Sequence, residues 1–244
     1  MKKDSLIVFC GKPPDYPGAV WQALDAAFNV SGFPQSAAGT TALLTGINVP
    51  VLLGRHISGF PTMELRKIIS ENSVYKQIKS IGKNSTFANT YNDAYFRRPL
   101  SRQSVTTHVV YAAGLPFRKL DEYRRGKAVF HYLRGEMIRR QGNEDSLSIP
   151  AEVIRNRNSL MGDSSTISED KVKNKNIPIL SPVEAGIRIV RLAQDYNFVL
   201  FEYVKTDLAG HSQDIRWANS IVNEVMMPRQ KVFIQFVNYA AHWS

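Results

Sequence analysis

The chain has 244 residues, of which 43% are hydrophobic and 10% aromatic, and its formal net charge is +10. This length and composition suffice for one domain with a sizeable core and exclude a disordered chain. No apolar run approaches the roughly 18 residues that a membrane span requires, and the single cysteine, Cys10, excludes an internal disulfide and a cysteine-based zinc site.

The positive charge is scattered along the chain rather than gathered in one segment, and no familiar nucleic-acid-binding motif is present. This pattern disfavours direct nucleic-acid function, whereas a basic surface suits an enzyme that attracts small, phosphate-bearing or other anionic substrates. The N-terminal apolar stretch is too short for the core of a signal peptide, so we expect a cytoplasmic protein. The basic pairs are Arg97-Arg98, Arg124-Arg125 and Arg139-Arg140, with further lysines at Lys171, Lys173 and Lys175.

In chain order, the first half predicts a strand and then mostly helices. Residues 5–10 are apolar enough for a buried strand, and a loop rich in proline and glycine follows. Residues 36–46 predict a helix of small residues that ends at Gly46. Further elements are expected as helices at 65–69, 74–81, 103–113 and 120–125 and as a strand at 85–89.

The second half begins with a change in composition. Residues 141–176 are polar and rich in serine and asparagine, which predicts an insertion or flexible loop within a single α/β domain formed by 1–140 and 177–244. Ser181, Pro182 and Glu184 then form the start signal of a helix.

The remaining elements decide the fold class. Residues 198–204 (FVLFEYV) predict a central strand, because β-branched and aromatic residues dominate the segment. A helix is expected at 214–227 and another strand at 231–239. Strands that alternate with helices predict an α/β fold with a largely parallel central sheet flanked by helices.

Two segments could carry chemistry. Asp207 and His211 follow the strand at 198–204, and Gly210 would allow a tight turn that brings a carboxylate and an imidazole to the edge of the sheet, where ligands bind in parallel folds. Oxygen and nitrogen ligands together suit zinc or manganese. The alternative is that Asp207 caps the next helix and His211 is a solvated loop residue.

Ser36, at the start of the expected helix 36–46, is open to two interpretations. Its hydroxyl could cap the helix by accepting a backbone amide hydrogen. It could equally be a nucleophile, if free amides of the first turn and a nearby metal stabilise the alkoxide and an incoming phosphoryl group. The segment is not a P-loop, because the lysine of that motif is absent.

Four segments together resemble the bacterial metalloenzyme-domain proteins of the alkaline phosphatase superfamily, relatives of cofactor-independent phosphoglycerate mutase, phosphopentomutase and the sulfatases. The similarity covers roughly residues 24–225, interrupted at 141–176, with the chain shortened at both ends. The segments are FPQSAAGTTALLTGINVPVLLGRHISGFP (33–61), FANTYNDAYF (87–96), ILSPVEAG (179–186) and LFEYVKTDLAGHSQD (200–214).

This resemblance implies an alkaline-phosphatase-like fold and a two-metal site for phosphoryl transfer. Ser36 lies where the superfamily places its metal-bound nucleophile, and Asp207 and His211 match an Asp-x-x-Gly-His element that holds one ion. Arg55 and His56, in a Gly-Arg-His motif, are expected to face the substrate. Hydrolase and mutase would differ only in the group that accepts the phosphoryl from Ser36.

The chain also departs from the family. Cys10 stands where the family has a metal-binding aspartate, and the Asp-His-Gly segment expected near the C-terminus is missing. Cys10 or His242 could substitute as ligands, although a structural role is favoured for each. His108 and His131 lack neighbours in the sequence that suggest ligands and are expected at the surface or in packing.

Two functions therefore remain open. The first is a metal-dependent phosphatase or phosphomutase-like hydrolase that uses Ser36 as its nucleophile and zinc or manganese as its cofactor. The second is a diverged or truncated, non-catalytic member that retains the fold and at most a weak metal or anion site.

Overall fold

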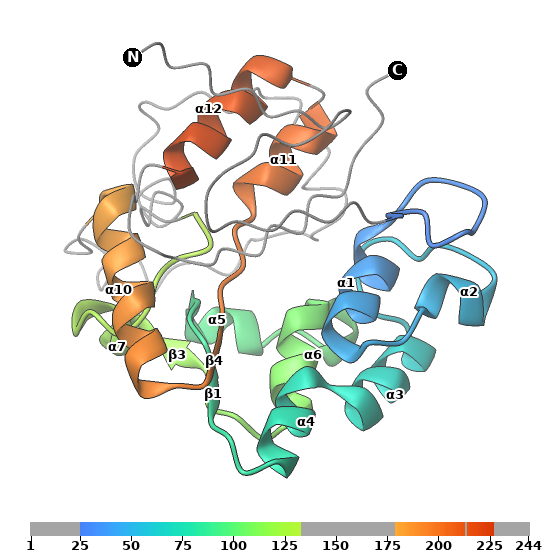
Figure 1. The fold of residues 1–244 in the computed structure, drawn as a ribbon, viewed down its shortest axis with the longest axis horizontal. Coiled ribbons are helices and arrows are strands. Elements are labelled where there is room, and N and C mark those ends of the chain that lie inside the picture. Colours follow the sequence, from blue (N-terminus) through green and yellow to red (C-terminus); the bar gives the residue numbers. More distant parts are fainter. Residues whose placement is uncertain (1–24, 133–178, 213, 227–244) are drawn as a thin grey trace, which may run out of the picture.

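The computed structural model describes residues 25–132, 179–212 and 214–226, and within them the backbone alone for 210–212, 223, 225 and 226 (Figure 1). The segments 5–10, 141–176 and 231–239, with Cys10 and His242, lie outside the described residues. Within these ranges, none of the helices combines the length and hydrophobicity that crossing a bilayer requires.

The described chain is a mixture of helices and short strands. The elements up to the first gap are α1 (Ser36–Thr45), α2 (Val49–Leu53), α3 (Met63–Asn72), α4 (Val74–Ser80), β1 (Ser85–Phe87), β2 (Thr90–Tyr91), α5 (Asp93–Phe96), a 3-10 turn (Leu100–Arg102), α6 (Val105–Ala112), β3 (Arg118–Lys119) and α7 (Leu120–Arg124). After the gap follow α10 (Pro182–Asp195), β4 (Phe198–Leu200), α11 (Lys205–Ser212) and α12 (Ile215–Met226).

Helix α1 is held by its small residues and by its terminal glycine. Gly46 has φ 75°, a left-handed conformation that favours glycine, and its N–H donates to Ala42 O to close the helix. Ala37, Ala38 and Gly39 are buried, so the backbone of α1 can approach its neighbours closely. The helix packs against α2, α3 and α6.

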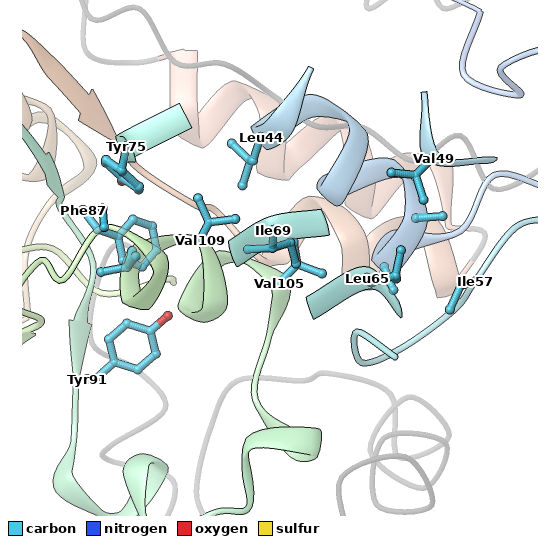
Figure 2. Close-up of a cluster of buried hydrophobic side chains, with 14 residues drawn as sticks. Leu44, Val49, Ile57, Leu65, Ile69, Tyr75, Phe87, Tyr91, Val105 and Val109 are labelled. Atoms are coloured by element: carbon cyan, nitrogen blue, oxygen red, sulfur yellow. The ribbon is translucent and has the colours of Figure 1, made fainter. Parts of the chain in front are cut away.

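A first hydrophobic core lies between these helices and the first strand. Figure 2 shows its side chains converging from α1, α3, α4, α6 and β1. Tyr75 and Phe87 are among its largest fully buried side chains. Its labelled members are Leu44, Val49, Ile57, Leu65, Ile69, Tyr75, Phe87, Tyr91, Val105 and Val109.

Two short parallel sheets run through the centre. β1 pairs with β4 in the register Ser85↔Phe198, Thr86↔Val199 and Phe87↔Leu200, and β2 pairs with β3. An isolated parallel bridge between Asn89 and Val129 lies between the two sheets. The α/β class with parallel strands is thus confirmed, but the described residues form small parallel sheets rather than one large central sheet.

Asparagine side chains extend the β1–β4 pair at both ends. The side-chain oxygen of Asn84 accepts the backbone N–H of Asn197 at 2.9 Å, and that of Asn197 accepts the backbone N–H of Asn84 at 3.1 Å. Beyond the other end, Asn89 donates to Glu202 O and accepts from Glu202 N, both at 2.8 Å. A side-chain amide has the same donor and acceptor as a peptide group, so the chains remain paired beyond the strands themselves.

A second core lies under α10 and α12. Ser181 caps α10 by accepting the N–H of Glu184 at 3.1 Å, with Pro182 in the first turn, which confirms the predicted start of this helix. Figure 1 shows α10 beside α7 and the strands. The buried members of this core are Ala88, Tyr123, Ala128, Val129, Leu180, Ala185, Ile189, Leu192, Phe201, Tyr203, Ala209 and Ile221.

Two predicted elements need correction at the carboxyl end of β4. The strand expected over 198–204 ends at Leu200, because Ala88 N–H takes the carbonyl of Leu200 and residue 202 then pairs with the side chain of Asn89. The turn expected at Gly210 is also wrong, since residues 205–212 form α11. The other predicted helices and the strand at 85–89 are confirmed, with ends that differ by a few residues.

Candidate functional site

Ser36 is the first residue of α1 and is half-buried. The N-cap position is occupied by Gln35, which has extended backbone angles and makes no side-chain cap, so the interpretation of Ser36 as the cap is wrong. The backbone N–H of Ala38 donates to Ile57 O at 3.0 Å. This first-turn amide is therefore engaged within the protein, contrary to the expectation that the amides of this turn are free for a phosphoryl group.

The Arg55–His56 segment lies against the chain that leads into α1. His56 Nε2 is 3.2 Å from Val30 O, and Ile57 accepts the Ala38 N–H described above. Arg55 forms an exposed ion pair with Glu64 at 3.9 Å, which contributes little to stability. The structure thus brings the Gly-Arg-His segment to the same end of α1 as Ser36.

Asp207 and His211 both lie on α11, four residues apart, so their backbone positions share one side of the helix. Asp207 is half-buried and lies within the first turn. The cap of the following helix is instead Asp214, whose Oδ1 accepts the N–H groups of Arg216 and Trp217 at 2.9 and 3.1 Å. The alternative role of Asp207 as the cap of the next helix is therefore wrong.

A second set of polar side chains meets where β4 ends, and the sequence did not single it out. Glu202 Oε2 accepts a hydrogen bond from Thr106 Oγ1 at 3.1 Å and lies 3.6 Å from His131 Nε2. The imidazole of His131 also contacts the rings of Tyr91 and Phe87 edge-on, with centroids 5.0 and 6.1 Å away. We call Glu202 and His131 the Glu202–His131 pair.

Burial shifts the pKa of both members of this pair. The pKa of Glu202 rises from 4.5 to about 7, mainly because of burial; the hydrogen bond from Thr106 opposes this rise and the nearby negative charge of Asp207 adds to it. Burial alone lowers the pKa of His131 from 6.5 to about 4. At neutral pH the imidazole is therefore uncharged and the carboxyl is about half protonated.

A chain of hydroxyl groups connects Glu202 to the start of α6. Thr106 Oγ1, which binds Glu202, lies 2.9 Å from Ser104 Oγ, and Ser104 Oγ lies 2.9 Å from Thr107 Oγ1. Thr107 Oγ1 is in turn 2.8 Å from the hydroxyl of Tyr95. Since α6 also packs against α1, this helix connects the part of the fold that carries Ser36 with the part that carries Glu202.

The resemblance implies a two-metal site, and the described residues offer some oxygen ligands for it. Asp207 offers an oxygen ligand at the half-buried start of α11, and the charge of Asp207 already acts on Glu202. The charge of Asp207 raises the pKa of Glu202, and a divalent cation would offset this repulsion between carboxylates, so a cation fits the charge of this region. Among the residues whose side chains are described, no three His, Cys, Asp or Glu side chains form a group that could hold a metal.

His108 is a packing residue, as expected. It is buried on α6, and its Nε2 bonds to Leu100 O at 2.9 Å. His131 was also assigned to packing or the surface, and its contact with Glu202 was missed. The one available signal was Glu202 itself, a carboxylate inside the otherwise apolar and aromatic segment FVLFEYV.

No family model, curated protein or solved structure matches the chain.

Proposed function

We propose that the chain is a metal-dependent phosphoryl-transfer protein, a phosphatase or phosphomutase-like hydrolase with an alkaline-phosphatase-like fold. Ser36 is the nucleophile, Asp207 and His211 are metal ligands, and Arg55 and His56 face a small phosphorylated or other anionic substrate. The observation that carries the proposal is where the two segments with candidate site residues lie in the fold. Ser36 begins a buried helix of small residues, and Asp207 and His211 share a helix that follows a parallel strand.

Each proposed site residue has a separate role in phosphoryl transfer. Ser36 gives up its hydroxyl proton and attacks the phosphorus in line, the P–O bond to the ester alcohol breaks, and the alcohol leaves after taking up a proton. Water or a second hydroxyl then accepts the phosphoryl group from the serine. Zinc or manganese held by Asp207 and His211 would, when bound, lower the pKa of the serine hydroxyl and neutralise phosphoryl charge. His56 Nε2 contacts Val30 O and holds the loop before Ser36 in place. Arg55 is exposed and, among the described residues, pairs with the exposed Glu64, so it can turn toward an anion.

One observation favours the second candidate, a non-catalytic member with at most a weak metal or anion site. The N–H of Ala38 in the first turn of α1 is bonded to Ile57 O. An oxyanion at Ser36 would therefore lack this donor, and preorganised donors are a major source of stabilisation for developing charge.

The test compares metal content and turnover of p-nitrophenyl phosphate in the wild type, Ser36→Ala and Asp207→Asn, with added zinc or manganese. Ser70→Ala is the matched control, because Ser70 is an exposed serine on α3 whose hydroxyl bonds to Lys67 O. We expect Ser36→Ala to reduce turnover by about 10³-fold or more with metal content retained, Asp207→Asn to reduce both, and the control to change neither. Wild-type protein without bound metal and with the same background rate as Ser36→Ala would overturn the proposal in favour of the non-catalytic member.

A further inference from the structure

The Glu202–His131 pair has hydrogen-bonding capacity that its neighbours do not use. Nε2 of His131 is 3.6 Å from the Glu202 carboxyl, which is too long for a hydrogen bond, and neither ring nitrogen has a hydrogen-bond partner among the described residues. Glu202 accepts from Thr106 through Oε2, while Oε1 has no partner in the described part of the chain. Both side chains are only half-buried, so these polar atoms can bond to water or to a ligand.

The position of the pair in the fold favours a ligand at these atoms. Glu202 follows the carboxyl end of β4, whose parallel partner is β1, and ligands of α/β folds bind at the carboxyl ends of parallel strands. The two side chains are not sealed from solvent, since that of His131 is 18% exposed and that of Glu202 is 32% exposed. A small molecule can therefore reach atoms that the protein leaves without partners.

The groups around the pair define the chemistry of this ligand. The titratable groups around Glu202 are His131, Asp207, Tyr75 and Tyr91, and none of them is a cation at neutral pH. A phosphate at this position would bring negative charge toward the Glu202 carboxyl. An alcohol hydroxyl is uncharged, can donate to Glu202 and accept from His131, and can place its carbon atoms against the rings of Tyr91 and Phe87.

We propose that Glu202 and His131 form a subsite that binds a hydroxyl group of the ligand, and that the substrate is a phosphate monoester of a polyhydroxy alcohol. The substrate class rests on the proposed phosphoryl transfer, whereas the hydroxyl subsite itself does not. Glu202 accepts the hydroxyl hydrogen through Oε1, and a ring N–H of His131 donates to the hydroxyl oxygen. The phosphate is directed away from the Glu202 carboxyl, toward Ser36.

The first experiment measures binding without turnover. The histidine side chains of ¹⁵N-labelled full-length protein are observed by NMR while glycerol, ethyl phosphate or 2-hydroxyethyl phosphate is added. The two phosphates differ by one hydroxyl group and carry the same charge. His131→Phe assigns the signal and keeps a ring against Tyr91, and His108 serves as the internal control because its Nε2 is already bonded to Leu100 O.

We expect glycerol and 2-hydroxyethyl phosphate to shift the His131 signal and to leave that of His108 unchanged. We also expect 2-hydroxyethyl phosphate to bind about two- to ten-fold more tightly than ethyl phosphate, which is the range for one net hydrogen bond. Glu202→Gln, which keeps the size of the side chain, should remove most of this preference. Equal affinities for the two phosphates, or shifts of His131 and His108 alike, would overturn the subsite. If His131→Phe does not fold, the titrations of the wild type and of Glu202→Gln still test whether the subsite binds the hydroxyl group.

The test of the hydroxyl subsite can fail or succeed independently of the test of phosphoryl transfer. A hydroxyl-dependent shift of His131 without Ser36-dependent turnover would leave the subsite standing and refute phosphoryl transfer together with the substrate class. Turnover that depends on Ser36, with the same KM for both phosphates in the wild type and in Glu202→Gln, would leave the enzyme standing and refute the subsite.

Discussion

The pH dependence of folding stability tests the environment of the Glu202–His131 pair directly. The native chain keeps a proton on Glu202 that the unfolded chain loses, since the pKa of Glu202 rises from 4.5 to about 7. Its contribution to stability is therefore complete below about pH 4.5 and is lost as the pH rises to about 7. For His131 the pKa falls from 6.5 to about 4, so its contribution is complete above pH 6.5 and is lost as the pH falls to about 4.

These two effects have opposite signs over the same range of pH, and together they leave the wild-type contribution nearly flat between about pH 5 and 6.5. Each pKa shift corresponds to about 3 kcal/mol for a fully buried group. With side chains 32% and 18% exposed, solvent screening reduces each contribution to about 1–2 kcal/mol. A variant that removes one member leaves the other unbalanced.

Urea unfolding of the wild type, Glu202→Gln and His131→Phe at pH 5, 6 and 7 separates the two contributions. Relative to the wild type, Glu202→Gln should lose about 1–2 kcal/mol of stability from pH 7 to pH 5, and His131→Phe should lose a similar amount from pH 5 to pH 7. Glu71→Gln, an exposed acid on α3, is the control and should follow the wild type. Variant slopes equal to the wild-type slope, or slopes of reversed sign, would refute the reasoning.

Three further changes test how the site is held. Asn89→Ala removes both hydrogen bonds to the backbone of Glu202, and we expect a loss of about 2–4 kcal/mol in urea unfolding; a loss below 0.5 kcal/mol, on the order of a surface change, would contradict the pairing. Glu224→Gln breaks the largely buried ion pair with Lys205 at 3.1 Å and should lower the unfolding free energy by about 1–3 kcal/mol. An unchanged melting temperature would show that the ion pair does not hold α11 against α12. Ser181→Ala should cost about 1 kcal/mol through loss of the α10 cap, and Ser181→Asp should restore most of it; equal stability of the two variants would exclude a capping role.

The helices could be predicted because their signals are local. Ser181 and Pro182 mark the start of α10 within a few residues, and Gly46 marks the end of α1, because caps and left-handed turns depend on the chain within one turn of the helix. The length of β4 could not be predicted in this way. FVLFEYV has strand propensity throughout, but its ladder ends at Leu200, where the partner strand β1 ends, and that partner lies far away in the sequence.

The candidate site was only partly accessible to sequence reasoning for the same reason. Asp207 and His211 could be found because they lie four residues apart in one segment. His131 could not, because it is far from Glu202 in the sequence and only the fold brings them to 3.6 Å. The roles of Ser36, Arg55, Asp207 and His211 in catalysis stay predictions. The engaged N–H of Ala38 was equally unpredictable, because its acceptor Ile57 belongs to the segment after α2.

The hydroxyl chain at the start of α6 links the charge of Glu202 to the packing of this helix. Ser104 Oγ accepts the N–H of Thr107 at 3.3 Å and so caps α6, and it also exchanges hydrogen bonds with Thr106 and Thr107. An ionised Glu202 can only accept, which obliges Thr106 to donate to it and leaves the oxygen of Thr106 to accept from Ser104. A protonated Glu202 can donate to Thr106 and removes this constraint. Because α6 packs against α1, ionisation of Glu202 orders the hydroxyls of a helix that supports Ser36. A ligand hydroxyl that donates to Oε1 of the ionised carboxylate should do so as well.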